Sequence, residues 1–227
     1  VLLEQYRAVL AIGRHNRDYV LARGVPADRV FLTPYGVEND RFPIVHRESE
    51  DRPFRFLFCG KLEPKKRPFD LLRAAALLAN EPGVPSFEVV VVGDGVLRSE
   101  LEELASQTDL RVDFRGFVNQ GALPAVYAAC DSLVLPSDAG ETWGLVVNEA
   151  MATGLPAIVS DAIGSANDLV LEGETGWVFP MGDVPGLAAV MRAALADLSE
   201  VRRLGAQAAT HVRAAHGPEH VAEGIVA

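Results

Sequence analysis

The amino-acid sequence predicts an α/β domain built as a doubly wound parallel sheet, with helices on both faces. Two observations predict it. From residue 54 onward, short runs rich in β-branched and aromatic residues alternate with longer helical runs. Several of the short runs are apolar throughout, as in strands that are buried on both faces. Apolar residues make up 49% of the 227-residue chain, which is enough for a sizeable core.

The strands and helices of this domain alternate along most of its length. Strands are expected at 54–60, 87–93, 111–116, 132–137, 156–160 and 175–180. Helices are expected at 68–80, 97–107, 123–130, 144–154, 184–198 and 200–215. The nearly continuous valine run at 87–93 is the clearest buried strand. Gly154 is a typical C-terminal residue for the helix predicted at 144–154.

Residues 1–53 differ from the rest of the chain. They predict a strand at 8–12, a helix at 15–24 and a strand at 29–34. The polar, proline-flanked stretch at 35–53 is interpreted as a linker. Three elements are too few to build an independent core, so the core is expected after the linker.

The composition excludes some classes of partner. The chain carries 31 acidic and 21 basic residues, a formal net charge of −10. Such a balance argues against general binding to nucleic acid or to an anionic membrane, because both need a basic face. No run of about 18 apolar residues predicts a transmembrane helix. Cys59 and Cys130 lie in apolar surroundings and are predicted to be buried thiols of a reduced compartment.

The loops that follow the predicted strands are rich in glycine or charge. Parallel strands bring such loops to one edge of the sheet, where open α/β domains bind ligands. The basic loop after the first strand of the domain suits a phosphate or diphosphate, although a solvated charge run before a helix explains it equally well. Its four cations are Lys61, Lys65, Lys66 and Arg67. The Gly-Asp-Gly turn at 93–95 lacks the dinucleotide fingerprint, and a simple tight turn also explains it.

Two glutamates flank a segment that is apolar on almost every side. Glu149 lies in the middle of the helix predicted at 144–154, where an unpaired carboxylate is costly and needs a partner or a ligand. Glu141 precedes the start of that helix, whose free N–H groups favour an anion. A ligand with hydroxyls at both ends and phosphates between would fit. The alternative is that Glu141 caps the helix and Glu149 pairs with a lysine or arginine.

These residues are part of a longer resemblance. The stretch ETWGLVVNEAMATGLPAIVSD resembles the signature of the retaining glycosyltransferases of family 4, also called group 1. That family has the GT-B fold, in which two Rossmann-like domains face a cleft. The blocks CGKLEPKKRPFDLL, VVVVGDGVLRSEL, VDFRGFV and EGETGWVFPMGD are similar to its other motifs, in the same order. The similarity runs from about residue 6 to the end of the chain and implies a Rossmann-like sheet, the C-terminal half of a GT-B enzyme.

The resemblance implies roles for individual residues. Lys61 and Lys66 would bind the donor diphosphate, Glu141 the sugar hydroxyls and Glu149 the ribose. The implied catalytic residues are Lys61, Lys66 and Glu141, with no metal ligand. The implied donor-binding residues are Gly93, Asp94, Gly95, Phe117, Val118, Thr142, Trp143, Gly144, Leu145 and Glu149. Phe117 and Val118 would hold the base.

The chain departs from the family pattern at several positions. Lys61 stands where the family usually has arginine, Arg67 where it has glycine, and Trp143 where it has phenylalanine. The turn IGSAND replaces a Gly-Gly-x-Pro-Glu turn and makes Asp168 the candidate for the position of its glutamate.

The resemblance also implies how the chain is organised. Residues 1–46 are expected to be a remnant of the N-terminal acceptor domain plus the linker, 47–215 the nucleotide-sugar-binding domain, and 216–227 a C-terminal crossover helix. The partner is then a nucleotide-diphosphate sugar, with no cofactor, metal or nucleic acid. The acceptor would be contacted mainly by the missing domain, which could also touch the inner face of a membrane, and a cytoplasmic location is expected.

Four functions are possible for such a site. The first is an intact enzyme that transfers the sugar with retention. The second is a donor-binding module that is inactive as this fragment, and the third is a nucleotide-sugar epimerase of the same fold. The fourth is a glycosidase with Glu141 and Glu149 as its carboxylate pair, which fits less well. Glycosidase carboxylates face each other across a bond at roughly 5–9.5 Å. A glutamate buried in the middle of a helix, beside a basic loop that suits a diphosphate, does not match that arrangement.

Overall fold

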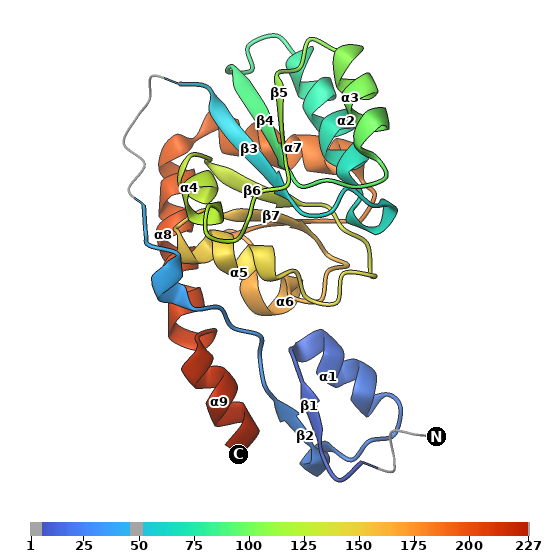
Figure 1. The fold of residues 1–227 in the computed structure, drawn as a ribbon, viewed down its shortest axis with the longest axis vertical. Helices are drawn as coiled ribbons and strands as arrows, with labels where there is room; N and C mark the ends of the chain where they lie inside the picture. Colours follow the sequence, from blue (N-terminus) through green and yellow to red (C-terminus); the bar gives the residue numbers. More distant parts are fainter. Residues whose placement is uncertain (1–5, 46–51, 227) are drawn as a thin grey trace.

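The computed structural model describes residues 6–45 and 52–226. The predicted domain boundary at 46/47, part of the predicted linker and the last residue of the expected crossover helix lie outside these residues. A large α/β domain carries three N-terminal elements beside it, and the last helix of the chain runs from that domain back toward them (Figure 1).

The large domain is built on one parallel sheet. Its strands are β3 (Phe54–Cys59), β4 (Phe87–Val92), β5 (Val112–Gly116), β6 (Ser132–Leu135), β7 (Ala157–Ser160) and β8 (Gly176–Phe179). They lie in the order β5-β4-β3-β6-β7-β8. The chain therefore winds outward in one direction from β3 and in the other from β6, which confirms the doubly wound prediction and places a topological switch point between these two strands.

Helices cover both faces of the sheet. The helices of the domain are α2 (Pro68–Ala79), α3 (Arg98–Ser106), α4 (Leu123–Ala128), α5 (Leu145–Ala152), α6 (Ala166–Leu169), α7 (Val184–Ala196) and α8 (Leu198–Ala215). Phe56 and Phe58 of β3 pack into the core beneath α2, α3 and α7. Leu57 of the same strand packs into the second core, beneath α4, α5 and α8 (Figure 1). Alternate residues of one strand thus fill two separate cores.

Most predicted elements are present with ends moved by one or two residues. The helix predicted at 184–198 ends at Ala196, because the Asp197 carboxylate accepts a hydrogen bond from the Glu200 N–H (3.0 Å) and starts a new helix. The short α6 was not predicted. The helix predicted at 15–24 is α1 (Arg14–Leu21), which ends before Gly24.

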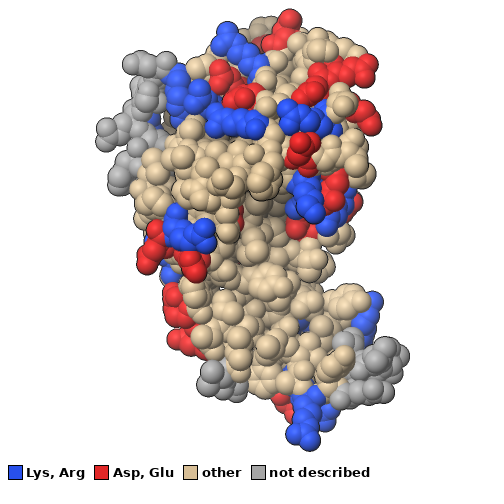
Figure 2. Space-filling model, viewed as in Figure 1, with Lys and Arg blue, Asp and Glu red and all other residues tan. Residues whose placement is uncertain are grey.

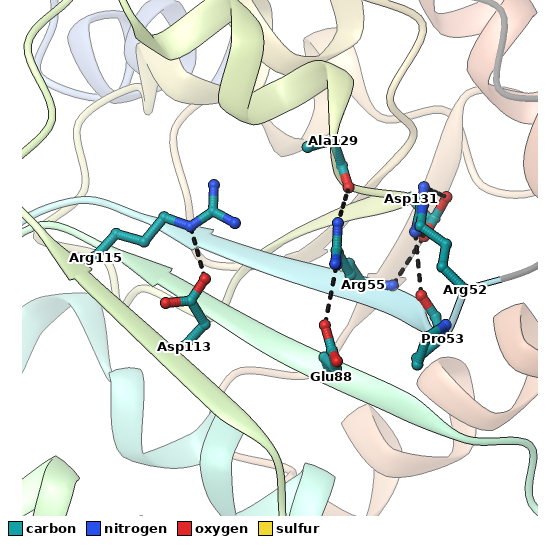
Figure 3. Close-up of polar contacts among 8 residues, drawn as sticks. All are labelled: Arg52, Pro53, Arg55, Glu88, Asp113, Arg115, Ala129 and Asp131. Atoms are coloured by element: carbon teal, nitrogen blue, oxygen red, sulfur yellow. Dashed lines mark hydrogen bonds and ion pairs between the residues drawn. The ribbon is translucent and has the colours of Figure 1, made fainter. Parts of the chain in front are cut away.

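One half of the sheet carries charge on the face beside α4. That helix has only six residues, and Arg55 and Glu88, near the start of β3 and β4, are partly exposed on this face. Arg55 and Glu88, paired in register, are joined at 3.0 Å, and Arg115 bonds Asp113 at 2.8 Å (Figure 3). Asp113 and Arg115 lie on β5, the edge strand of the sheet, where paired charges suit water and discourage pairing with another strand.

The N-terminal elements are a parallel pair, β1 (Val9–Ala11) and β2 (Val30–Leu32), with α1 between them in sequence. The predicted linker contains a 3-10 turn, Asn39–Arg41. Arg213 of α8 holds this turn by donating to the carbonyls of Asn39 (3.2 Å), Phe42 (2.7 Å) and Ala152 (3.2 Å). The molecule narrows where the linker passes from the sheet domain to the N-terminal elements (Figure 2).

The last helix, α9 (Pro218–Val226), returns to these elements and lies within the range expected for the crossover helix. The Thr33 hydroxyl donates to the Gly224 carbonyl at 3.2 Å. Within residues 6–45 and 52–226, no helix is both long enough and apolar enough to cross a membrane.

Candidate functional site

Lys66 and Glu141 are in contact at the carboxyl edge of the sheet. Lys66 closes the 3-10 turn Pro64–Lys66 after β3, and Glu141 lies in the loop after β6. These strands are neighbours, so their loops meet, and the Asp138 N–H donates to the Lys65 carbonyl at 2.8 Å. The Lys66 ammonium forms an ion pair with the Glu141 carboxylate, and the two side chains are 14% and 12% exposed. Glu141 therefore pairs with the basic loop, and the capping alternative is wrong.

The start of α5 lies directly after Glu141 and offers unused hydrogen-bond donors. No acceptor in the described part of the chain meets the backbone N–H groups of residues 142–145. The loop itself is fixed, because the Gly164 N–H donates to the Glu141 carbonyl (3.0 Å) and the Ser165 hydroxyl to the Trp143 carbonyl (2.6 Å). Free amides at a helix N-terminus beside a lysine form a place for an anion.

Glu149 is held at the other end of this segment by a residue that the sequence did not single out. It is 8% exposed, and its Oε2 accepts a hydrogen bond from the Tyr127 hydroxyl at 2.6 Å. Burial raises the pKa of the Glu149 carboxyl, while the Tyr127 hydrogen bond and the charge of Arg41 oppose the rise. The predicted burial of Glu149 is confirmed, but its hydrogen-bond partner is a tyrosine, not a lysine or arginine.

The two glycines of the Gly-Asp-Gly turn are required by the neighbouring loop. A Cβ on Gly93, whose φ is +130°, would lie 1.9 Å from the Gly60 carbonyl oxygen. One on Gly95 would lie 2.4 Å from the Leu62 oxygen. The Leu62 N–H donates to the Asp94 carbonyl at 2.9 Å, so the loops after β3 and β4 form one unit. The structure thus gives these glycines a packing reason that does not involve a ligand.

The remaining predicted residues lie at different depths. Phe117 is 80% exposed just beyond β5, whereas Val118 is half-buried and packs on the core. Lys61 and Asp94 are exposed, and the Asp94 carboxylate accepts from the Gly95 N–H at 2.8 Å. All four lie in loops that follow β3, β4 or β5, on the same edge as Lys66.

Trp143 is buried, and its side chain is therefore not part of an open site. Its indole N–H donates to Asn148 Oδ1 at 2.8 Å, and the Asn148 amide donates to the Tyr35 carbonyl at 3.2 Å. Asn148 has no exposed surface. A tryptophan at this position needs an acceptor for its N–H, and a buried asparagine supplies it. The pair links the start of α5 to the linker.

Asp168 connects the site to the N-terminal elements. Its Oδ2 accepts from the Arg14 N–H at 3.0 Å, at the start of α1, and the Arg14 guanidinium lies 3.7 Å from its other oxygen. Burial raises the pKa of the Asp168 carboxyl, against the contacts with Arg14. The carboxylate proposed for the glutamate position of the turn thus holds the start of α1 against α6.

Comparison with known proteins identifies the family. Residues 40–211 match the model of the family described as glycosyl transferases group 1. The amylovoran biosynthesis glycosyltransferase AmsK of Erwinia amylovora is 30% identical over 84% of this chain and 48% of its own length. The D-inositol 3-phosphate glycosyltransferase of Nocardia farcinica is 31% identical over 100% of this chain and 52% of its own length. The chain thus spans about half the length of these relatives.

Solved structures show the same fold. Sucrose-phosphate synthase from Thermosynechococcus elongatus superimposes with a TM-score of 0.84 and 29% identity, over 99% of this chain and 58% of that one. Anabaena HepE, solved in complex with UDP-glucose, gives a TM-score of 0.81 and 22% identity over 99% of this chain and 65% of its own. Such neighbours share the Rossmann-like sheet of GT-B glycosyltransferases. The chain belongs to the group 1 glycosyl transferases.

Proposed function

We propose that this chain is the donor-binding part of an enzyme that moves a sugar from a nucleoside diphosphate to an acceptor. The row of groups along one sheet edge carries the proposal: the Lys66–Glu141 pair, the unbonded N–H groups of residues 142–145, and Glu149 one helical turn further on. The hydroxyls of a sugar are bound well by a carboxylate, and a diphosphate is bound by positive charge and amide N–H groups. The hydroxyls of a ribose are bound well by a second carboxylate, so the three parts of the ligand match the row of groups in order.

Two further observations support parts of the proposal. The neighbour HepE was solved with UDP-glucose, which favours a nucleotide sugar as the donor. Retention of the anomeric configuration rests on the resemblance of residues 141–149 to the retaining enzymes of family 4. The nucleotide base would lie against Phe117 and Val118.

The charges of the site suit departure of a nucleoside diphosphate. When the bond between sugar and phosphate breaks, negative charge grows on the diphosphate, and Lys66, Lys61 and the N–H groups of residues 142–145 would stabilise it. The proposal assigns no metal and no organic cofactor. Because Lys66 is paired with Glu141 in the free protein, an arriving phosphate would replace Glu141 as its partner. The freed carboxylate would then accept hydrogen bonds from the sugar.

The rest of the activity belongs to the complete enzyme. Since the chain spans about half the length of its relatives, we propose that the acceptor is held mainly by a preceding domain, in a cytoplasmic enzyme that touches the membrane only peripherally through that domain. Taken alone, the chain is proposed to bind the donor without transferring the sugar.

Substitution of Lys66 tests the proposed reaction. In the complete enzyme, Lys66→Ala is expected to lower kcat by about 100-fold or more while the protein still folds and melts cooperatively, because it removes charge from the leaving diphosphate. Lys65→Ala is the matched control: this neighbour is 47% exposed and lies 3.5 Å from Glu63, so a few-fold loss at most is expected. Near-normal turnover of Lys66→Ala would contradict the assignment.

A further inference from the structure

A buried chain of three polar groups lies beneath Glu149. The Tyr127 hydroxyl lies 2.6 Å from Glu149 Oε2 and 3.8 Å from the Cys59 sulfur. Tyr127 and Cys59 are buried in the core under α4 and α5. The three residues come from α4, α5 and β3, so the contact exists only in the folded domain.

The direction of the hydrogen bonds follows from the number of protons. A phenol has one hydrogen, and the short contact to the Glu149 carboxylate takes it. Burial raises the pKa of the Cys59 thiol to about 11, so the thiol keeps its proton and can donate to the Tyr127 oxygen. Burial also raises the pKa of Tyr127 well above its ordinary value, which keeps the phenol protonated as a donor.

Tyr127 itself has little freedom. It has no exposed surface, and its ring meets the Phe42 ring edge-on with centroids 6.1 Å apart. Phe42 belongs to the linker segment whose carbonyls Arg213 holds. Because the Tyr127 hydroxyl cannot move, its hydrogen bond also holds Glu149 Oε2 in one position. The other, Oε1, accepts no hydrogen bond from residues 6–45 or 52–226, although the side chain still reaches the surface.

We infer that Tyr127 is a positioning residue for the ribose of the donor: it orients the Glu149 carboxylate so that a free oxygen faces the ribose hydroxyls. The inference rests on the proposed function, in which Glu149 binds the ribose. Tyr127 touches no substrate and acts only through Glu149. It should therefore affect binding of the ribose hydroxyls and leave contacts to base and phosphate unchanged.

Calorimetric titration of the 227-residue chain tests the inference. The probes are the ribonucleoside diphosphates of uridine, guanosine, adenosine and cytidine, and then the 2′,3′-dideoxy counterpart of the tightest binder. Wild type should prefer the ribonucleotide by about tenfold or more. Tyr127→Phe should weaken the ribonucleotide by about tenfold and leave the dideoxy probe within about twofold. Tyr19→Phe, on the exposed face of α1, is the matched control and should change neither.

A double-mutant cycle separates positioning from a structural role. Glu149→Gln should also weaken the ribonucleotide, and adding Tyr127→Phe to it should cause no further loss, because both act on one contact. The inference is overturned if Tyr127→Phe keeps the wild-type ratio between the two probes, weakens both probes equally, or adds fully to Glu149→Gln. Failure of the wild-type chain to bind any of the four diphosphates would instead overturn the proposed function, and the inference with it.

The pH dependence of binding gives a second readout. Glu149 is faced by Tyr127 from α4, by Cys59 from β3 and by Arg41 from the linker. Removing the Tyr127 hydrogen bond raises the pKa of Glu149, so the loss of ribonucleotide binding on acidification should begin at higher pH in Tyr127→Phe than in wild type. Should that variant lose its cooperative melting, Cys59→Ala replaces it: a selective loss of about twofold for the ribonucleotide is expected, and an unchanged ratio overturns the inference.

Discussion

Arg67 adopts a backbone conformation that a glycine would adopt more easily. Its φ and ψ are 50° and 43°, and it is the one non-glycine residue with positive φ in the described ranges. That conformation costs an ordinary residue about 1 kcal/mol. Its guanidinium donates to the Asp70 carboxylate at 2.7 Å, and the Asp70 side chain is almost fully buried. The family pattern has glycine here, so this chain accepts strain beside Lys66 in exchange for an ion pair.

Comparing the two magnitudes predicts the effect of restoring glycine. Arg67→Gly relieves about 1 kcal/mol of strain but leaves Asp70 buried without its cation, which costs about 3 kcal/mol. We expect a net loss of about 2 kcal/mol in the free energy of unfolding, measured in urea. In an Asp70→Asn background the same change should be neutral or stabilising. Stabilisation by Arg67→Gly alone would show that the ion pair contributes little.

The residues of the site could be predicted to different extents. The rule that ligands bind beyond the carboxyl ends of strands placed Lys66 and Glu141 on one edge, and the apolar helix predicted a buried Glu149. Tyr127 was missed because its partner lies 22 residues away on another helix. The buried Asn148 was also missed, although an asparagine inside an apolar helix is itself a signal that a donor or acceptor is near.

Among the elements, the junction of α8 and α9 crosses the linker at His216. The Val37 N–H donates to the His216 carbonyl at 3.2 Å, and the imidazole lies 3.4 Å from the Tyr35 oxygen and 6.1 Å, between ring centroids, from Trp143. Burial lowers the pKa of His216 to about 4. The imidazole is therefore neutral where the α8–α9 junction meets the linker, and its protonation should oppose folding.

The sign of the pH effect follows from this shift. In the unfolded chain His216 has an ordinary pKa of about 6.5, so it binds a proton below that pH, whereas in the folded protein it stays neutral down to about pH 4. The free energy of unfolding therefore falls as the pH drops from about 6.5 to about 4. We expect this histidine to account for a loss of about 3 kcal/mol over that range. His216→Gln should reduce the fall in melting temperature between pH 7 and pH 4.5. The exposed His15→Gln is the control, and equal falls in wild type and His216→Gln would contradict the assignment.

The ends of helices and strands were predicted well where a local sequence signal sets them. The path of the chain was predicted poorly where a contact with a distant segment sets it. The six strands of the sheet follow from short apolar runs, and Asp197 ends one helix through its own side chain. The linker, in contrast, takes its path from Arg213 and His216, which lie more than 170 residues further along the chain. No local pattern in residues 35–45 reports these partners.

On the scale of the whole molecule, one sheet edge gathers the predicted site residues, and contacts between distant segments tie the N-terminal elements and the linker to the sheet domain. These contacts include the Asp168–Arg14 contact, the Asn148–Tyr35 bond and the crossing at His216. The proposed donor site and the contacts with the linker therefore share residues of α5. The sequence predicted the sheet and its edge, whereas these ties depend on packing between segments that are far apart in the chain.

A crystal structure of this chain with a bound nucleoside diphosphate would show directly which groups meet the ribose and the phosphates. We expect the ribose hydroxyls to lie within hydrogen-bond distance of the Glu149 carboxylate, with the diphosphate between Lys66 and the N–H groups of residues 142–145. The Lys66–Glu141 pair should be opened by the phosphate. A nucleotide bound away from this edge, or one whose ribose lies at Glu141 and whose phosphates avoid Lys66, would contradict it.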